Sequence, residues 1–151
     1  MSDTDGVEAL YFALLDAWNR RDAAAMASLY ADDGIQIGFD GSRADGREQV
    51  RAHLEPIFRD HPTARFVAQV RDCRLLGGDH ALLTAAAGML PPGSDRIKPE
   101  NNALQTLVAS RIAGEWRVEL FQNTPAAWHG RDEDRAELTA ELQALADRSP
   151  R

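Results

Sequence analysis

The sequence of 151 residues has little of several things that would assign it to a particular class of protein. Its single cysteine, Cys73, excludes an intramolecular disulfide and a cysteine-rich zinc site. It has no run of about 18 apolar residues and no apolar segment directly after Met1, so we expect neither a membrane span nor export. These features together predict a cytoplasmic protein.

The sequence also has fewer basic than acidic residues, 17 against 24. The formal net charge is -7, and the basic residues are spread along the chain instead of forming a stripe. A field of this sign repels phosphate backbones and anionic lipid, so we expect no nucleic-acid or membrane partner.

Motifs that hold cofactors or activate nucleophiles are missing as well. No Gly-x-Gly-x-x-Gly segment follows a predicted strand, and no phosphate loop, nucleophile elbow or metal-spaced histidine pair is present. The sequence therefore predicts chemistry without a bound cofactor or metal.

Helical periodicity dominates the first sixty residues. Apolar residues recur at spacings of three and four over 7–18, which predicts a helix with one buried face. Asp22 is placed to cap a second helix over 23–30, and the Asp32-Asp33-Gly34 segment predicts a turn that ends it. A short strand over 34–39, with Ile35 and Ile37 on one face, precedes a third helix that begins near Arg47.

The pattern then changes to extended structure. Strands are predicted over about 65–76, 79–90, 103–113 and 115–123, and glycine-containing turns join the first pair and the last pair. Trp116, Val118 and Leu120 alternate with charged residues along the last strand and predict its buried row, which Gln122 continues. A final helix over about 132–147 has a narrow leucine stripe and is expected to dock on this chain or on a partner. We predict one domain spanning 1–151, with its core at about 7–125.

Four stretches carry a resemblance to a known family: Trp18-Asn19-Arg20-Arg21-Asp22, Leu29-Tyr30-Ala31-Asp32-Asp33-Gly34, Gly46-Arg47-Glu48 and Phe121-Gln122-Asn123-Thr124-Pro125. With His53 and the order of predicted elements, they resemble the nuclear-transport-factor-2-like superfamily. Within it, they look like the SgcJ/EcaC branch, near the SnoaL-like polyketide cyclases.

This resemblance implies an α+β fold in which a cone-shaped, curved antiparallel sheet packs against three N-terminal helices, with an additional C-terminal helix. It also implies an apolar cavity between sheet and helices, a homodimer formed through the outer sheet face, and a place in polyketide or enediyne antibiotic biosynthesis. Ketosteroid isomerases of this superfamily have an aspartate and a tyrosine where this sequence is expected to have Gly38 and Leu14, so that particular activity is not predicted.

His53 is the candidate catalytic residue. Its ordinary pKa near 6.5 lets an imidazole exchange protons at neutral pH, and its position beside Leu54 places it at the inner edge of the third helix. The alternative is a hydrogen-bonded structural histidine at the rim of the cavity.

The candidate ligand-binding residues are neutral or aromatic. Amides can orient a carbonyl and stabilise enolate charge, although they cannot act as bases. Large aromatic and sulfur side chains offer the surface that a flat apolar ligand needs. The candidates are Trp18, Tyr30, Phe39, Phe58, Met89, Gln105, Gln122, Asn123 and Trp128.

Two functions are compatible with these residues. The first is cofactor-free proton transfer, dehydration or cyclisation of an apolar polyketide-type intermediate, in which His53 moves the proton and Gln122 or Asn123 holds an oxygen. The second is a non-catalytic protein that binds and shields such an intermediate, or docks on a polyketide synthase or tailoring enzyme. The scarcity of ionisable residues at the expected cavity favours the second.

Overall fold

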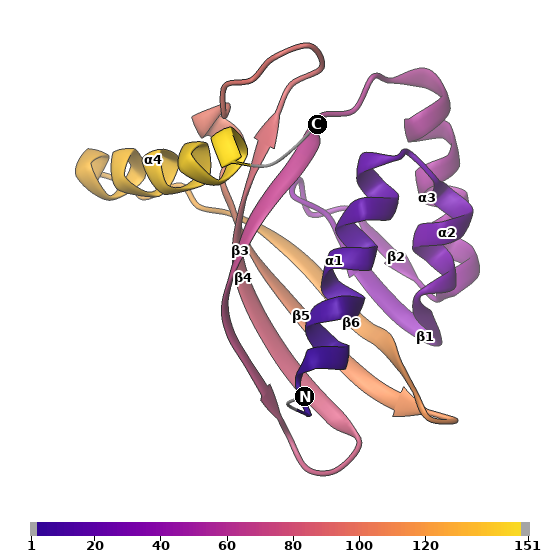
Figure 1. Cartoon of the computed structure of the whole chain (residues 1–151). Helices are drawn as coiled ribbons and strands as arrows, with labels where there is room; N and C mark the ends of the chain where they lie inside the picture. Colours follow the sequence, from indigo (N-terminus) through magenta and orange to yellow (C-terminus); the bar gives the residue numbers. More distant parts are fainter. Residues whose placement is uncertain (1–2, 149–151) are drawn as a thin grey trace.

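The computed structural model describes residues 3–148 and has an α+β architecture (Figure 1). One curved sheet has the strand order β2-β1-β6-β5-β4-β3. The helices α1, α2 and α3 cover one face of this sheet, here called the inner face, and α4 lies across one end of the outer face. The elements are α1 (Asp5–Asn19), α2 (Ala23–Ser28), β1 (Tyr30–Ile37), β2 (Arg43–Asp45), α3 (Arg47–Asp60), β3 (Arg65–Leu75), β4 (His80–Leu90), the short 3-10 helix η1 (Pro99–Asn101), β5 (Ala103–Ile112), β6 (Glu115–Pro125) and α4 (Asp132–Arg148).

Helix α1 forms where the apolar spacing predicts it. Val7, Tyr11 and Leu14 lie on one face of the helix and have no exposed surface. The last residue, Asn19, fastens the helix to β3: its side-chain nitrogen donates to the Phe66 carbonyl at 3.1 Å, and its oxygen accepts from the Phe66 N–H at 2.7 Å. The amide thus imitates a neighbouring strand.

Helix α2 is capped as predicted, because Asp22 accepts a hydrogen bond from the Ala25 N–H at 2.9 Å. The helix ends at Ser28, however, and not at Tyr30. The Arg47 guanidinium binds the Tyr30 carbonyl through two donors, and Tyr30 pairs with Val118 of β6. Tertiary hydrogen bonds therefore override the helical pattern of the last two residues.

The predicted turn at Asp32 and Asp33 is wrong. Both residues belong to an irregular part of β1, where the pairing with β6 shifts between Tyr30 and Ile35. Their side chains are exposed, and Asp32 lies 3.2 Å from an Arg47 nitrogen. The short strand β2, within the predicted loop before α3, was not anticipated.

The four long strands form the expected antiparallel meander. Strand β6 departs from strict alternation, because Ala109 pairs with Val118 while Val108 pairs with Leu120, which leaves Glu119 as an additional residue. A single extra residue moves every later side chain of the strand to the opposite face.

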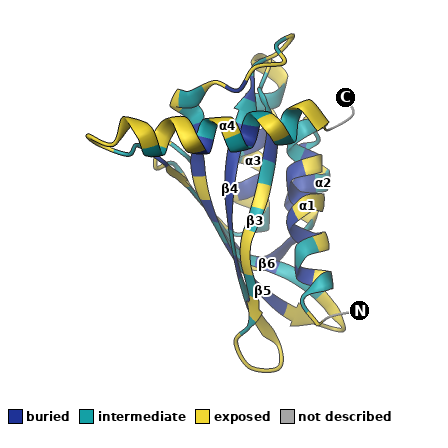
Figure 2. Ribbon diagram, turned by 60° about the vertical axis from the view of Figure 1, so that its left-hand side comes forward, coloured by how far each residue is buried: buried dark blue, intermediate teal, exposed yellow. Residues whose placement is uncertain are grey.

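Helix α4 docks on this chain, against the outer face of β3 and β4 (Figure 2). Its buried residues Leu138 and Leu142 form a second apolar cluster with Val67 and neighbouring residues. Gly88 makes this close approach possible, since a Cβ there would lie 2.9 Å from the Leu142 Cδ1 atom. Within residues 3–148, no helix covers the rest of the outer face.

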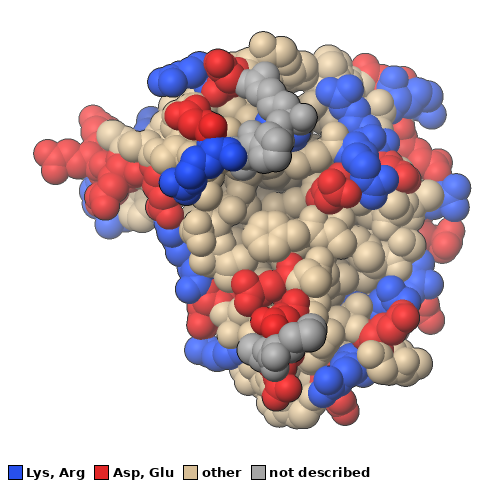
Figure 3. Space-filling view, viewed as in Figure 1, with Lys and Arg blue, Asp and Glu red and all other residues tan. Residues whose placement is uncertain are grey.

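Acidic and basic side chains are mixed around the margin of the face seen in Figure 3, and uncharged residues occupy its middle. Many charged side chains of the protein are paired, and the ion pair of Arg71 with Glu141 joins β3 to α4. No helix within residues 3–148 is both long and apolar enough to cross a membrane.

Candidate functional site

A cavity of about 260 Å³ lies between the helical layer and the inner face of the sheet. Helices α1, α2 and α3, strands β1, β3, β4 and β6, and the loop after β1 all contribute to its wall. The lining residues are Trp18, Met26, Gln36, Ile37, Gly38, Phe39, Asp40, Ser42, His53, Leu54, Ile57, Phe66, Met89, Phe121 and Asn123.

Most of this wall is apolar and held in place from behind. The indole of Trp18 donates to the Ala64 carbonyl at 2.9 Å, which fixes the plane of the ring. Phe58 and Phe66 pack against the same indole, with ring centroids at 5.1 and 5.5 Å. Such a wall buries the flat surface of a one- or two-ring ligand, and the volume is slightly below the roughly 300–1,000 Å³ of sites for drug-sized molecules.

Ionisable groups of the lining are confined to Asp40 and His53. Asp40 accepts a hydrogen bond from the Ser42 N–H at 2.9 Å. Hydrogen bonds from the Ser42 backbone and hydroxyl hold the pKa of this carboxyl below its ordinary value, and the nearby His53 imidazole adds to the effect. His53 is half buried and has no hydrogen-bond partner among the described residues. The imidazole is thus available to a ligand, with a carboxylate close by.

Asn123 is the first of two carboxamides in the wall. Its side-chain oxygen accepts a hydrogen bond from Gln105 at 3.1 Å, and the Gln105 oxygen accepts one from the Tyr11 hydroxyl at 2.5 Å. Gln105 is 1% exposed and Tyr11 is fully enclosed, so a buried relay runs from α1 through β5 to the cavity.

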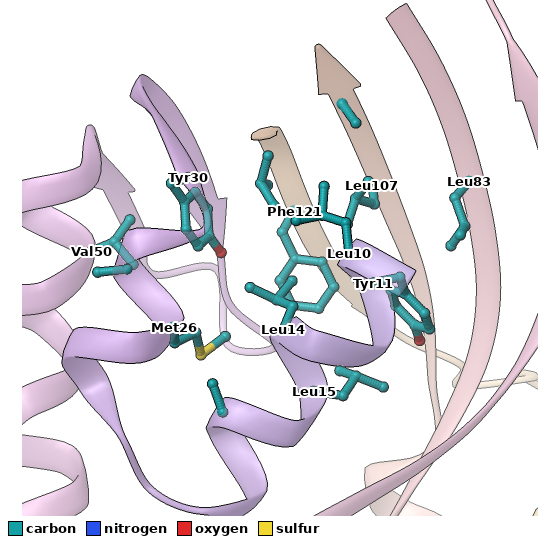
Figure 4. Close-up of a cluster of buried hydrophobic side chains, with 14 of the residues drawn as sticks. Leu10, Tyr11, Leu14, Leu15, Met26, Tyr30, Val50, Leu83, Leu107 and Phe121 are labelled. Atoms are coloured by element: carbon teal, nitrogen blue, oxygen red, sulfur yellow. The ribbon is translucent and has the colours of Figure 1, made fainter. Parts of the chain in front are cut away.

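Gln36 is the second carboxamide. Its oxygen accepts a hydrogen bond from the buried Tyr30 hydroxyl at 3.0 Å. Gln36 pairs in register with Phe121, and Figure 4 shows the Phe121 ring between Tyr30 on one side and Tyr11 on the other. Burial raises the pKa of both tyrosines, so both hydroxyls keep their protons at neutral pH.

Five residues predicted from the sequence line this cavity together: Trp18, Phe39, His53, Met89 and Asn123. Three others lie directly behind the wall. Tyr30 supports Gln36, Gln105 supports Asn123, and Phe58 supports Trp18. The structure assigns these three a supporting place and not one on the cavity surface.

Two predicted residues lie elsewhere. Gln122 faces the outer side of the sheet, because the extra residue Glu119 reverses the alternation of β6. Trp128 packs with the second apolar cluster beneath α4, where the Arg131 guanidinium lies 4.9 Å above its ring. Neither position agrees with the predicted contact to a ligand in this cavity.

Gln36 was missed by reasoning from the sequence. The residue lies between Ile35 and Ile37, and only these two isoleucines were considered when the apolar face of the strand was predicted. In the structure both isoleucines are half-buried, Ile35 on the outer face and Ile37 bordering the cavity, and Gln36 points inward with 8% exposure. The sequence feature that could have indicated an inward-facing amide is the position of this glutamine between two β-branched residues of a strand.

A larger open groove of about 870 Å³ runs between α4 and residues 96–99 on the outer side of the molecule. Its lining comes from these two segments, and it does not reach His53 or the carboxamides. Over residues 3–148, no three His, Cys, Asp or Glu side chains are grouped as a metal site would require.

Comparison with known proteins identifies the family. The model of the SnoaL-like domain matches residues 7–133, most of the chain. The chain belongs to the SnoaL-like domain family. No curated protein matches it significantly.

Solved structures confirm the fold of this SnoaL-like protein. A domain of unknown function with a cystatin-like fold from Nostoc punctiforme is 22% identical, with a TM-score of 0.77 over 97% of this chain and 94% of that one. A nuclear-transport-factor-2-like protein of unknown function from Shewanella oneidensis is 17% identical, with a TM-score of 0.67 over 82% and 99%. A ketosteroid isomerase-like protein from Erwinia carotovora is 19% identical, with a TM-score of 0.66 over 83% and 98%.

Proposed function

We propose that this SnoaL-like protein binds an apolar small molecule in the cavity of about 260 Å³ and acts on it in natural-product biosynthesis of the polyketide or enediyne type. The observation that carries the proposal is the composition of the wall, which is largely aromatic and aliphatic with a few polar groups. Such a wall favours a ligand with one or two rings and few charges. The four stretches that resemble the SgcJ/EcaC branch support the biosynthetic role.

The reaction we propose is proton transfer without a cofactor, as an isomerisation or as the first step of dehydration or cyclisation. His53 takes a proton from the carbon beside a ligand carbonyl. The electron pair of that C–H bond forms the C=C bond of an enolate, and the π pair of the carbonyl moves to its oxygen. The proton then returns from His53 to another carbon as the carbonyl re-forms, or to a leaving hydroxyl as its C–O bond breaks. The negative charge of Asp40, which lines the same cavity, favours the imidazolium that forms in between.

A model ketone tests this reaction directly. We expect the wild-type protein to accelerate exchange of the α-protons of β-tetralone for deuterium in D₂O, followed by NMR. His53→Gln should bind β-tetralone with similar affinity and lose the acceleration, about 10²-fold or more for a lost general base. Equal exchange rates in the two proteins would rule out His53 as the base.

The alternative is a protein that binds and shields a reactive intermediate without transforming it. It is favoured by the wall having only two ionisable side chains. Tight binding of β-tetralone by the wild type, without any acceleration of exchange, would support this alternative.

We also propose that two copies associate through the uncovered outer face. Apolar side chains of four strands gather there, and Leu104 is 45% exposed. The others are Ile35, Leu82, Val108 and Leu120. Leu104→Asp should shift the protein from dimer to monomer in sedimentation velocity. Leu76→Asp, a change of equal kind at a 46% exposed residue beside the β3–β4 turn, should not.

A further inference from the structure

The direction of the two carboxamides in the cavity wall depends on buried tyrosines. A carboxamide offers oxygen on one side and an NH₂ group on the other, so it can present either an acceptor or donors to a ligand. Which it presents is decided by the neighbour that binds its other end. Here that neighbour is in each case a tyrosine hydroxyl, directly or through one more amide.

The relay behind Asn123 has one direction in which every buried group is paired. The Tyr11 hydroxyl has a single proton and lies in the core, where its one hydrogen-bond partner within residues 3–148 is the Gln105 oxygen. With its oxygen on Tyr11, Gln105 turns its NH₂ group to Asn123. Asn123 must then use its oxygen to accept, and its own NH₂ group is left for the cavity. Turning Gln105 around would leave the Tyr11 proton without an acceptor.

The pair of Tyr30 and Gln36 reaches the same result in one step. The Tyr30 hydroxyl is fully buried and donates to the Gln36 oxygen, which directs the Gln36 NH₂ group away from the core. This nitrogen has no hydrogen-bond partner within residues 3–148. It is also not among the fully enclosed unpaired atoms of the described chain, which are Asn102 Oδ1 and Trp128 Nε1. The nitrogen therefore lies at the surface of the cavity that Gln36 lines.

The NH₂ groups of Gln36 and Asn123 lie in the same part of the cavity. Gln36 pairs in register with Phe121, and Asn123 follows two residues later on the same face of β6. With strands about 4.8 Å apart and a rise of about 3.3 Å per residue, the two Cα atoms are roughly 8 Å apart. Both side chains are long enough for their NH₂ groups to reach one ligand oxygen with two lone pairs, or two nearby oxygens. Phe121, the strand partner of Gln36, lines the same cavity with an apolar ring.

We propose that Gln36 and Asn123 form a paired donor site for a ligand carbonyl or enolate oxygen, and that Tyr30 and Tyr11 act as positioning residues that keep both amides in the donor orientation. The inference rests on the proposed function and narrows it: the ligand carries an acceptor oxygen in an otherwise apolar ring system. Negative charge that develops on this oxygen is stabilised by donors that are oriented before the ligand arrives.

The test uses two ligands of nearly the same shape, β-tetralone with a carbonyl and tetralin without one. The measured quantity is the ratio of their dissociation constants, together with the infrared stretching frequency of the bound carbonyl. Relative to wild type, Asn123→Leu should reduce the preference for the ketone by about five- to tenfold, the value of one neutral hydrogen bond. The carbonyl stretch should move to higher frequency as the donor is lost.

The contribution of Gln36 to the donor site can be tested without leaving a buried polar group unpaired. The double variant Tyr30→Phe/Gln36→Leu removes hydroxyl and amide together and should reduce the ketone preference by a similar factor. Tyr30→Phe alone keeps Gln36 but frees it to turn, so the carbonyl stretch should broaden and rise while tetralin binds as before. Gln69→Leu, on the exposed part of β3, is the matched control and should change neither readout.

The outcomes separate the two levels of the proposal. If tetralin and β-tetralone bind but neither the ratio nor the stretch responds to these variants, the donor site is wrong and the apolar cavity stands. If wild-type protein binds neither probe, the proposed function itself is overturned and the donor site with it.

Discussion

The two faces of the sheet both carry apolar residues, but they differ in how far these residues are buried. On the inner face, helices α1 to α3 cover the strands, and residues such as Leu83 and Leu107 have no exposed surface. On the outer face, α4 covers only one end, and Leu104 remains 45% exposed. Apolar content alone therefore does not determine where the core lies. The layer above the sheet decides whether a leucine is part of the interior, of the cavity wall or of a contact surface.

The sharpest test of this comparison uses neighbouring leucines of β4. Leu83 faces inward and is fully buried, whereas Leu82 faces outward and is half exposed. Leu83→Ala should lower the free energy of unfolding by about 3 kcal/mol, because it leaves a cavity in the core. Leu82→Ala should cost roughly 1 kcal/mol in the monomer. Equal losses in urea denaturation would contradict the assignment of the faces.

The covered end of the outer face depends on close approach of α4. In Gly88→Ala the new methyl group would meet Leu142 at 2.9 Å and Ile97 at 3.2 Å, so α4 must move away. We expect a loss of about 1–3 kcal/mol and faster hydrogen exchange in α4. Gly78→Ala, where no atom lies within 4 Å of the added carbon, serves as the control and should be neutral. Unchanged exchange in α4 would argue against its docking on β4.

Both layers are also fastened to β3, on the inner side by an amide. Asn19→Ala removes both hydrogen bonds to Phe66 and should cost about 1–2 kcal/mol by chemical denaturation. Asn101→Ala, whose side chain makes no hydrogen bond within the described part of the chain, should stay within about 0.5 kcal/mol of wild type. A loss in Asn19→Ala no larger than this would show that packing alone holds α1.

On the outer side the fastening is an ion pair, and its contribution should depend on pH. A hydrogen bond from Arg71 lowers the pKa of Glu141 below its ordinary value of 4.5. A carboxyl with a lowered folded pKa stabilises the fold above its unfolded pKa and loses this contribution as the pH falls through the folded value. The effect should be below about 1 kcal/mol, since both side chains are more than a third exposed.

Comparing wild type with Glu141→Gln between pH 3 and pH 7 measures this contribution. The difference in unfolding free energy should be present at neutral pH and vanish in acid. A difference that grows toward acid would have the wrong sign for this ion pair.

Much of the fold could be predicted from the sequence, because it depends on local patterns. The helical spacing over α1, the Asp22 cap and the turns between the long strands each concern residues a few positions apart. The SnoaL-like family and the α+β fold are confirmed. The end of α2 could not be predicted, because it is decided by Arg47 and Val118, which are distant in the sequence.

The site was harder to predict for the same reason. Strict alternation along β6 placed Gln122 inside, and the one additional residue at Glu119 put Asn123 there instead. No local sequence feature near Glu119 predicts the bulge, because the bulge arises from the pairing of β6 with β5. Gln36 became visible only when its bond to Tyr30 and the inward direction of its side chain were known.

The parallel pairing of β1 with β6 has a consequence for how the chain is made. Ile35 and Gln36 pair with Leu120 and Phe121, so the contact spans more than half of the chain. During synthesis, β1 leaves the ribosome long before β6 has been made, so the edge of β1 that pairs with β6 stays unpaired until then. Contacts of such wide separation slow folding. We therefore expect the last stage of folding to be the insertion of β6 between two parts already formed, which makes truncation within β6 more damaging than loss of α4.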